Sequence, residues 1–155
     1  MNPRKSIQIL VADDDADDRM LLNEALQENR FANAVQFVKD GQELIDYLKN
    51  RGIYANRELH PRPGLILLDL NMPKKDGREA LQEIKSDPEL RDIPIVILTT
   101  SKAEEDIYRS YQLGVNSFVT KPVTFDSLVT LTRELGRYWF ELVELPVRPH
   151  SRALF

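Results

Sequence analysis

The chain of 155 residues contains no cysteine, which excludes disulfides, cysteine-based zinc sites and thiol nucleophiles. This composition suits a reducing cytoplasm, the compartment that we expect. No apolar run approaches the ~20 residues that a membrane-spanning helix needs. The first residues also lack the apolar stretch of a signal peptide. We therefore expect no membrane partner.

The chain also lacks an excess of positive charge: it has 21 Lys and Arg and 25 Asp and Glu, which gives a formal net charge of −4. Nucleic-acid binding normally leaves a basic footprint on a protein, so we expect no nucleic-acid partner. The chain has only two histidines, His60 and His150, and both lie in proline-rich segments without metal-ligand spacing. We expect both imidazoles to be exposed to solvent.

Short apolar runs alternate five times with segments of helical periodicity. The runs are mostly apolar instead of alternating with polar residues, which is typical of strands covered by helices on both faces. Gly114 is expected to end the fourth helix, and residues 51–64 to form a long surface loop. The pattern predicts a doubly wound α/β domain with a five-stranded parallel sheet. We expect strands at about 7–11, 35–38, 65–68, 95–98 and 117–120, and helices at about 17–28, 44–48, 80–84, 103–113 and from 125 onward.

Polar side chains follow the predicted strands where each one ends, at the edge of the sheet where α/β proteins bind ligands. Crowded carboxylates at one edge repel one another, and a hard cation such as Mg²⁺ relieves that repulsion. A lysine can contact a phosphoryl oxygen and a threonine can donate a hydrogen bond to another. One carboxylate is then left as a nucleophile that can form an aspartyl-phosphate. The residues in these positions are Asp13 and Asp14, then Asp69 and Asn71, then Thr99, then Lys121.

Four motifs carry a resemblance to the receiver domains of two-component response regulators, over almost the whole chain. They are Ile-Leu-Val-Ala-Asp-Asp ending at Asp14, Leu-Leu-Asp-Leu-Asn-Met-Pro-Lys-Lys-Asp-Gly ending at Gly77, Ile-Leu-Thr-Thr-Ser ending at Ser101, and Phe-Val-Thr-Lys-Pro ending at Pro122. The resemblance implies the flavodoxin-like (βα)5 receiver fold. It also implies a signalling protein that accepts a phosphoryl group, not an enzyme.

The resemblance further implies a role for each residue of the motifs. It implies that Asp69 is the phosphoacceptor and that Lys121 contacts the phosphoryl group. Asp14, Asp69 and the backbone carbonyl of Asn71 are implied to hold Mg²⁺, with Asp13 acting through water. Thr99 and Phe118 are implied to form a switch pair, and the bond between Lys121 and Pro122 is implied to be cis. Phe118 departs from the more frequent tyrosine, which puts any step that needs its hydroxyl in doubt.

The implied partner is a sensor histidine kinase, whose phosphohistidine supplies the phosphoryl group. The implied output is a change of the face formed by the fourth helix, fifth strand and fifth helix. Several features look more like phytochrome-associated regulators than like chemotaxis receivers, which makes a phytochrome the expected kinase. These features are the long 51–64 segment, the Asp-Gly-Arg that ends at Arg78, the Leu-Thr-Thr-Ser that ends at Ser101, and the aromatic tail around Trp139.

Apolar residues in the C-terminal part recur at spacings of 3, 4, 3, 4 and 3, from Leu128 to Leu145. That spacing is an a/d heptad seam, so the fifth helix is expected to extend beyond the sheet, with Gly136 as a weak point. We therefore divide the chain into a receiver domain, 1–137, and an extension, 138–155, that dimerises. Ordinary packing of the fifth helix on the sheet is the alternative. The expected interface consists of Leu135, Tyr138, Trp139, Phe140, Leu142 and Leu145.

Three other functions fit the sequence less well. A haloacid-dehalogenase-type phosphohydrolase carries Asp-x-Asp after its first strand, whereas Asp69-Leu-Asn71 follows the third strand here. A pseudo-receiver acting without phosphorylation does not need the full set of acids, hydroxyl and lysine. A transcription factor needs a DNA-binding unit, and no helix-turn-helix fits after Leu145. A chemotaxis-like receiver remains the alternative within the family.

Overall fold

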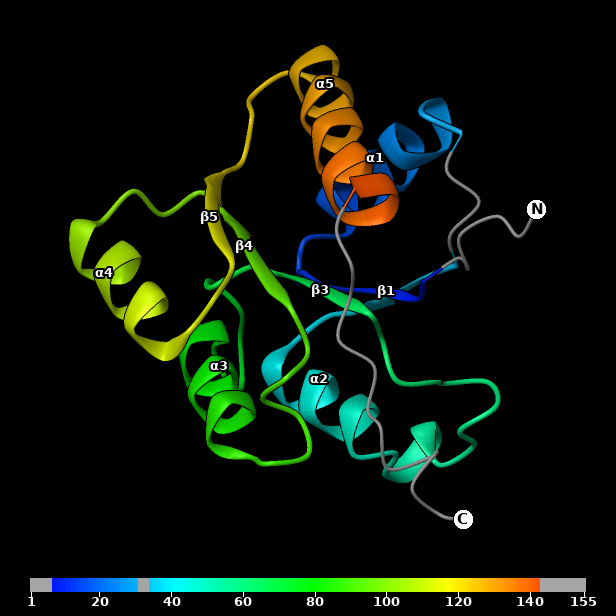
Figure 1. Cartoon of the computed structure of the whole chain (residues 1–155), viewed down its shortest axis with the longest axis vertical. Coiled ribbons are helices and arrows are strands. Elements are labelled where there is room, and N and C mark those ends of the chain that lie inside the picture. Colours follow the sequence, from blue (N-terminus) through cyan, green and yellow to red (C-terminus); the bar gives the residue numbers. More distant parts are fainter. Residues whose placement is uncertain (1–6, 31–33, 143–155) are drawn as a thin grey trace.

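The computed structural model describes residues 7–30 and 34–142, with side chains through Trp139. Five parallel strands form one sheet in the order β2-β1-β3-β4-β5, and helices alternate with them (Figure 1). The predicted five-stranded (βα)5 fold is confirmed. The elements are β1 Ile9–Ala12, α1 Ala16–Glu28, β2 Val35–Val38, α2 Gly41–Leu48, the 3-10 helix η1 Gly52–Tyr54, β3 Leu65–Leu68, α3 Gly77–Ser86, β4 Ile95–Thr99, α4 Glu104–Leu113, β5 Ser117–Thr120, α5 Phe125–Gly136 and the π-helix η2 Arg137–Leu142.

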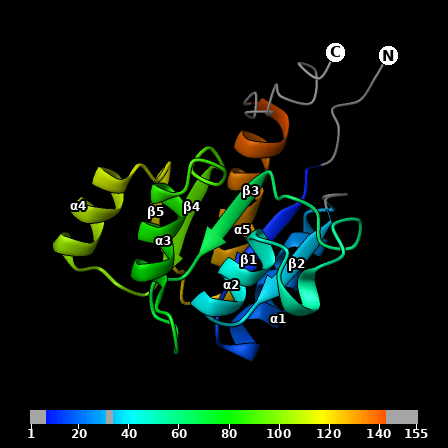
Figure 2. The ribbon, with the colours of Figure 1, turned by 90° about the horizontal axis from the view of Figure 1, so that it is seen from below.

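Helices cover both faces of the sheet, α1 and α5 on one side and α2, α3 and α4 on the other (Figures 1 and 2). Each side has its own hydrophobic cluster. On the first side, Leu22 and Leu26 of α1 pack with Ile9 and Val11 of β1. On the other side, α2 and α3 pack against the alternate residues of the same strands. This double covering explains why the three inner strands β1, β3 and β4 are buried along their whole length.

The register of the strands brings their carboxyl ends to one edge. Ala12 pairs with Leu68, so Asp13 and Asp69 follow side by side. The Asp69 N–H donates to the Ala12 carbonyl at 3.0 Å, and the Lys121 N–H donates to the Thr99 carbonyl at 2.8 Å. Main-chain hydrogen bonds of the sheet therefore continue one residue into the candidate site and fix its backbone.

Caps and close turns fix where three of the helices begin or end. The Asp15 side chain accepts hydrogen bonds from two N–H groups at the start of α1, as expected of an N-cap. Gly114 ends α4 with a φ of 100°, a left-handed conformation that glycine adopts without strain, as predicted. A Cβ on Gly77 would lie 2.2 Å from the Asp69 carbonyl oxygen. Only glycine therefore lets α3 begin this close to the end of β3.

Residues 51–64 are more ordered than a simple surface loop. The His60 ring is half-buried, with its centroid 5.0 Å from that of Tyr54 and 5.5 Å from that of Tyr47, in edge-on contacts. The expectation that His60 is exposed is wrong, because the two tyrosines offer its ring apolar surface and favourable edge-to-face geometry. His150 lies outside the described residues.

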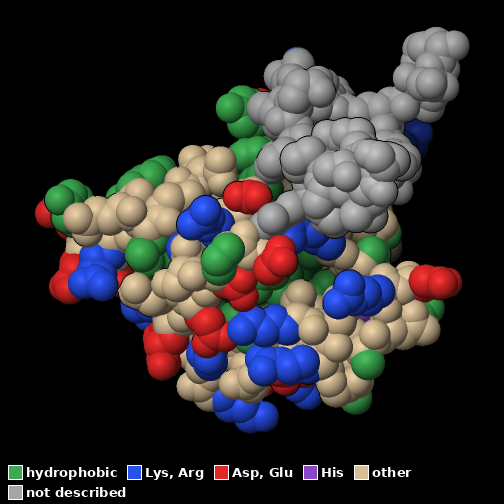
Figure 3. Space-filling view, turned by 60° about the horizontal axis from the view of Figure 1, so that its bottom comes forward, with side chains coloured by type: hydrophobic (Ala, Val, Ile, Leu, Met, Phe, Trp, Pro, Cys, Tyr) green, Lys and Arg blue, Asp and Glu red, His purple; other side chains and the backbone are tan. Residues whose placement is uncertain are grey.

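Charged side chains of both signs are intermixed on the face that Figure 3 displays. Among the described residues, no helix is both long enough and apolar enough to cross a membrane.

Helix α4 is the most exposed helix on its side of the sheet, since Ser110 is its only buried residue. This helix therefore depends on few contacts for its position.

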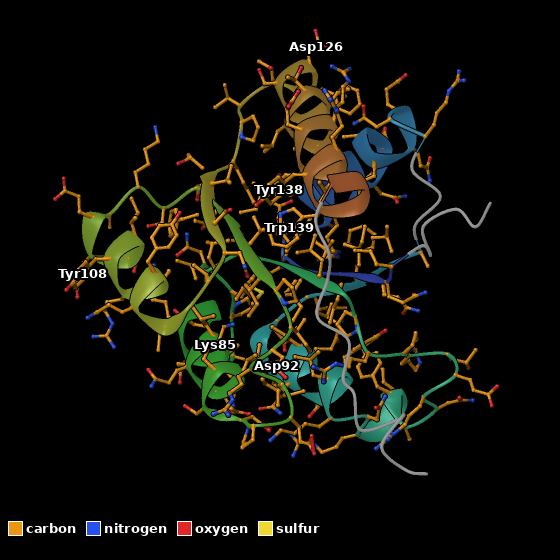
Figure 4. All side chains as sticks on the ribbon, viewed as in Figure 1. Lys85, Asp92, Tyr108, Asp126, Tyr138 and Trp139 are labelled. Atoms are coloured by element: carbon orange, nitrogen blue, oxygen red, sulfur yellow. The ribbon has the colours of Figure 1, made fainter. Side chains whose placement is uncertain are left out.

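The helical structure changes type at Gly136, where α5 gives way to the π-helix η2. Trp139 is only 6% exposed and belongs to the α1–α5 hydrophobic cluster, against which Leu135 also packs (Figure 4). The expectation that an extended fifth helix carries Trp139 beyond the sheet to an exposed interface is wrong, because the indole packs on the chain's own core and is removed from water. Tyr138 is 52% exposed. The side chains of Phe140 and Leu142, and the whole of Leu145, lie outside the described part, so the proposed 137/138 boundary stays a prediction.

Candidate phosphoacceptor site

Four strand ends bring the predicted residues together at one edge of the sheet. Lys121 lies at the centre: its Nζ is 2.6 Å from Asp13 Oδ2 and 2.9 Å from Asp69 Oδ2. Asp13 and Asp69 are buried, and Lys121 is half-buried. A lysine after β5 therefore neutralises carboxylates that follow β1 and β3, which is the convergence that the sequence predicts.

The second oxygen of Asp69 is held from the other side. Thr99, fully buried at the end of β4, donates its hydroxyl to Asp69 Oδ1 at 2.7 Å. The Asn71 N–H donates to the same oxygen at 3.0 Å. The side-chain amide of Asn71 also donates a hydrogen bond to Thr99 Oγ1, at 3.5 Å. Both oxygens of Asp69 are therefore oriented by neighbouring donors, and its carboxylate presents a defined geometry.

Asp13, Asp14 and Asp69 offer oxygens that all lie within 4.8 Å of one another. Asp14 is exposed, whereas the other two are buried, so the cluster opens to solvent on one side. Hard carboxylate oxygens around a partly open space fit a divalent cation such as Mg²⁺, which keeps several of its waters and uses one or two carboxylates. The predicted acidic set is thus assembled in a form that can hold a divalent metal ion.

Burial and pairing have opposite effects on the charges of the site. Burial raises the pKa of Asp13 above its ordinary value, although its hydrogen bond to Lys121 opposes the rise. Burial alone would lower the pKa of Lys121, but hydrogen bonds to Asp13, Asp18 and Asp69 outweigh it and hold that pKa above the usual range. Lys121 therefore remains an ammonium group in this site.

Asp18 is a member of the site that the sequence reasoning missed. Its Oδ2 lies 2.8 Å from Lys121 Nζ, so Lys121 contacts three carboxylates. The sequence carried only a weak signal for it: Asp18 lies in the first turn of α1, three residues after the N-cap Asp15. The acidic face of α1 therefore continues one turn from the strand end.

A second polar cluster lies beside the site and was also missed. Arg78 of α3 binds Asp106 of α4 through Nε and Nη2, each 2.7 Å from a carboxylate oxygen. Asp106 also accepts a hydrogen bond from Ser101 at 2.7 Å. The Arg78 pair holds the pKa of Asp106 at about 2. No sequence pattern indicates this pair, because 28 residues separate its members.

The predicted switch residues lie on adjacent strands. Phe118 is half-buried and packs against the α2–α3 side of the core. Its N–H donates to the hydroxyl of Tyr111 on α4, at 3.1 Å. Phe118 has no hydroxyl of its own, so in this chain the hydroxyl contact between α4 and β5 comes from Tyr111.

The expectation of a cis bond between Lys121 and Pro122 is wrong in this structure, since the described residues contain no cis peptide bond. The X–Pro amide favours trans by about 0.5–1 kcal/mol. With the trans bond, Lys121 Nζ still reaches all three carboxylates. The cis expectation came from the resemblance alone and not from the residues.

Comparisons with known proteins give one consistent answer. Residues 9–133 match the response regulator receiver domain family. The response regulator Rcp1 of Synechocystis sp. is 44% identical over 145 residues, which cover 94% of this chain and 95% of Rcp1.

Two solved structures are similar over the same length. The phosphorylated cyanobacterial phytochrome response regulator RcpA has a TM-score of 0.85 at 43% identity and covers 92% of this chain and 100% of its own. The Mn²⁺-bound form of Rcp1 has a TM-score of 0.83 at 41% identity, with 91% and 99% covered. With the strand-end aspartates, threonine and lysine gathered at one edge of a five-stranded sheet, this chain belongs to the response regulator receiver family and is a homologue of the phytochrome-linked response regulators.

Proposed function

We propose that the chain accepts a phosphoryl group on Asp69 from the phosphohistidine of a sensor histidine kinase. The observation that supports this best is the pair of contacts on Asp69: Lys121 Nζ at 2.9 Å from Oδ2, and Thr99 Oγ1 at 2.7 Å from Oδ1. An ammonium and a hydroxyl that now hold the carboxylate can instead bind phosphoryl oxygens. Phosphoryl transfer asks a protein mainly for such positioning and charge stabilisation.

In the proposed transfer, a carboxylate oxygen of Asp69 bonds to phosphorus while the bond from phosphorus to the kinase imidazole nitrogen breaks. The imidazole, protonated on its other nitrogen, leaves as the neutral ring. Lys121 balances the negative charge of the transferred group. Asp14, Asp69 and the Asn71 carbonyl would hold Mg²⁺, with Asp13 beside them. When bound, the ion neutralises charge on the phosphoryl oxygens.

We propose a phytochrome as the kinase, because the relatives at 43–44% identity include proteins described as phytochrome response regulators. The signal leaves through the face formed by α4, β5 and α5. After phosphorylation, Thr99 moves from Asp69 toward the new oxygens and Phe118 turns into the space beside it. The change is a two-state switch that a local charge event biases.

We also propose that this face, with the residues after α5, forms a homodimer. β5 is an edge strand of the sheet. Three exposed aromatic side chains belong to this part of the molecule: Tyr108 and Tyr111 of α4, and Tyr138 beyond α5. Exposed aromatic patches commonly mark interfaces. Trp139 takes no part in this version of the interface, because it is buried in its own chain.

Phosphorylation of Asp69 is tested by incubating the chain with Mg²⁺ and either acetyl phosphate or a panel of purified sensor kinases, phytochromes included. We expect a phosphoryl label that alkali and hydroxylamine remove on the wild type, none on Asp69→Asn, and the fastest transfer from a phytochrome kinase. Asp92→Asn is the matched control, since Asp92 precedes β4 at the opposite edge of the sheet (Figure 4).

A label that persists in Asp69→Asn would move the phosphoacceptor to another residue. No label on the wild type with any donor would favour a pseudo-receiver instead.

A further inference from the structure

The Arg78–Asp106 ion pair joins α3 to α4 beside the phosphoacceptor site. The guanidinium presents two N–H groups in parallel to the two carboxylate oxygens, each at 2.7 Å. This bidentate arrangement is the most directional form of ion pair. Arg78 also contacts Asp76, its own N-cap, at 3.0 Å. The guanidinium is thus anchored at the start of α3 while it holds the start of α4.

Each member of the pair also holds a residue that flanks Asp69. Arg78 Nη2 donates to Asn71 Oδ1 at 3.4 Å, and Asn71 lies two residues after Asp69. Asp106 Oδ2 accepts from the Ser101 hydroxyl at 2.7 Å, and Ser101 lies two residues after Thr99. The ion pair therefore connects two residues that contact the acceptor site. The Asn71 N–H donates to Asp69 Oδ1, and the Ser101 N–H donates at 3.4 Å to the Thr99 hydroxyl oxygen. The described hydrogen bonds link neither Arg78 nor Asp106 to the Asp69 carboxylate itself.

The two helices do not pack closely beside the ion pair. A cavity of about 760 Å³ lies between α3 and α4, and both Arg78 and Asp106 line it. Ser110 is the only buried residue of α4. With so few packing contacts nearby, loss of the ion pair would leave Asn71 and Ser101 free to adopt other side-chain positions.

We propose that Arg78 and Asp106 are positioning residues that lengthen the life of the phosphoryl group on Asp69, by holding Asn71 and Ser101 where they restrict the approach of water. This inference rests on the proposed phosphorylation of Asp69. In the hydrolysis that they slow, the water oxygen bonds to phosphorus and the bond from phosphorus to the Asp69 oxygen breaks. Asp69 leaves as a carboxylate, and both protons of the water remain with the phosphate as dihydrogen phosphate.

The test compares rates of hydrolysis after labelling with acetyl phosphate and Mg²⁺ and removal of the donor. We expect Arg78→Gln and Asp106→Asn each to lose label about threefold to tenfold faster than the wild type, an effect the size of the net contribution of one ordinary hydrogen bond. The double variant should lose label no faster than the faster single variant, because two residues that act as one unit are not additive.

Two further measurements separate positioning from general damage. Glu83→Gln is the control, because it breaks the Lys75–Glu83 ion pair, which lines the same cavity. In the described contacts this ion pair touches neither Asn71 nor Ser101, so the variant should keep the wild-type lifetime of the phosphoryl group. The rate of labelling by acetyl phosphate should change less than about twofold in all variants, whereas a loosened site would slow labelling and hydrolysis together.

Equal lifetimes in the wild type and both single variants, additive effects in the double variant, or labelling and hydrolysis slowed together would each overturn the inference while leaving phosphorylation of Asp69 intact. A wild type that takes no label would overturn the proposed function and this inference with it.

Discussion

Single side chains in the site do more than one task, and Lys121 is the clearest case. Its ammonium is hydrogen-bonded to three carboxylates, from the ends of β1 and β3 and from the first turn of α1. Removing one partner of such a buried group leaves the others uncompensated, which costs more than the pair itself contributes. A lysine that stabilises the unphosphorylated site is therefore already in place to contact a phosphoryl oxygen.

The Asp106 carboxyl makes a pH-dependent contribution to stability. Its folded pKa of about 2 lies below its ordinary value of 3.8 because of the Arg78 pair. A depressed carboxyl pKa stabilises the fold above the unfolded pKa, and that stability is lost as the pH falls toward the folded value. Asp106→Asn should therefore cost about 1–2 kcal/mol at pH 7, a figure reduced for the partial exposure of Arg78, and the difference from wild type should shrink between pH 4 and pH 2.

Urea unfolding of both proteins at several pH values measures this effect. Glu105→Gln is the control, since Glu105 is exposed on the same turn of α4 and the described contacts give it no ion pair. A difference between wild type and Asp106→Asn that stays constant down to pH 2 would contradict the assignment of the low pKa to Asp106.

Among the elements, the last helical segment is bound more firmly to the domain than its sequence suggests. α5 packs against α1, and Trp139 in η2 completes the hydrophobic cluster that those helices form with the sheet. Leu128, Leu131 and Leu135 pack against the same cluster. The first half of the heptad pattern thus reflects ordinary packing of α5 on its own sheet, the alternative reading of that spacing.

Trp139→Ala should lower the free energy of unfolding by about 3 kcal/mol, because it leaves a cavity in a packed cluster. Tyr138→Ala is the matched control: the neighbouring ring is half exposed, and its loss should cost less than about 1 kcal/mol. Urea unfolding followed by far-ultraviolet circular dichroism measures both. Tryptophan fluorescence cannot be used, because Trp139 is the only tryptophan in the chain and one variant removes it. Equal losses in the two variants would mean that the indole does not pack as described.

On the scale of the whole chain, β5 is one of the two edge strands of the sheet. β5 is bordered by α4, whose Tyr108 points away from the body of the domain (Figure 4). The Tyr111 hydroxyl occupies the Phe118 N–H, so that main-chain donor of β5 is already satisfied. A second copy would therefore contact this face through side chains more than through strand pairing.

Sedimentation velocity at tens of micromolar tests the proposed homodimer. We expect a dimer for the wild type and a shift to monomer for Tyr108→Glu, which places a charge on the α4 face. Ile53→Glu is the control, because Ile53 is even more exposed than Tyr108 but lies in η1, which packs beside α2 and not on the α4 face. A wild type that sediments as a monomer at every concentration would exclude the dimer.

The positions of the strands and of the site could be read from local pattern. β2, β3 and β5 have the bounds that the sequence predicts, and the bounds of β1 and β4 differ from the predicted ones by one or two residues. Because parallel strands end at one edge, polar residues directly after each run had to converge there. Asp13, Asp69, Thr99 and Lys121 were found this way, from positions along the chain alone.

Other features depended on partners far away along the chain, and only the three-dimensional structure established them. Lys121 and Asp18 are 103 residues apart, and Arg78 and Asp106 are 28 apart. Trp139 lay in an aromatic tail that fits a dimer interface as well as a domain core, and His60 lay in a segment with loop composition. Local periodicity tells which residues share a face, but the surface that buries that face is set by packing between distant elements.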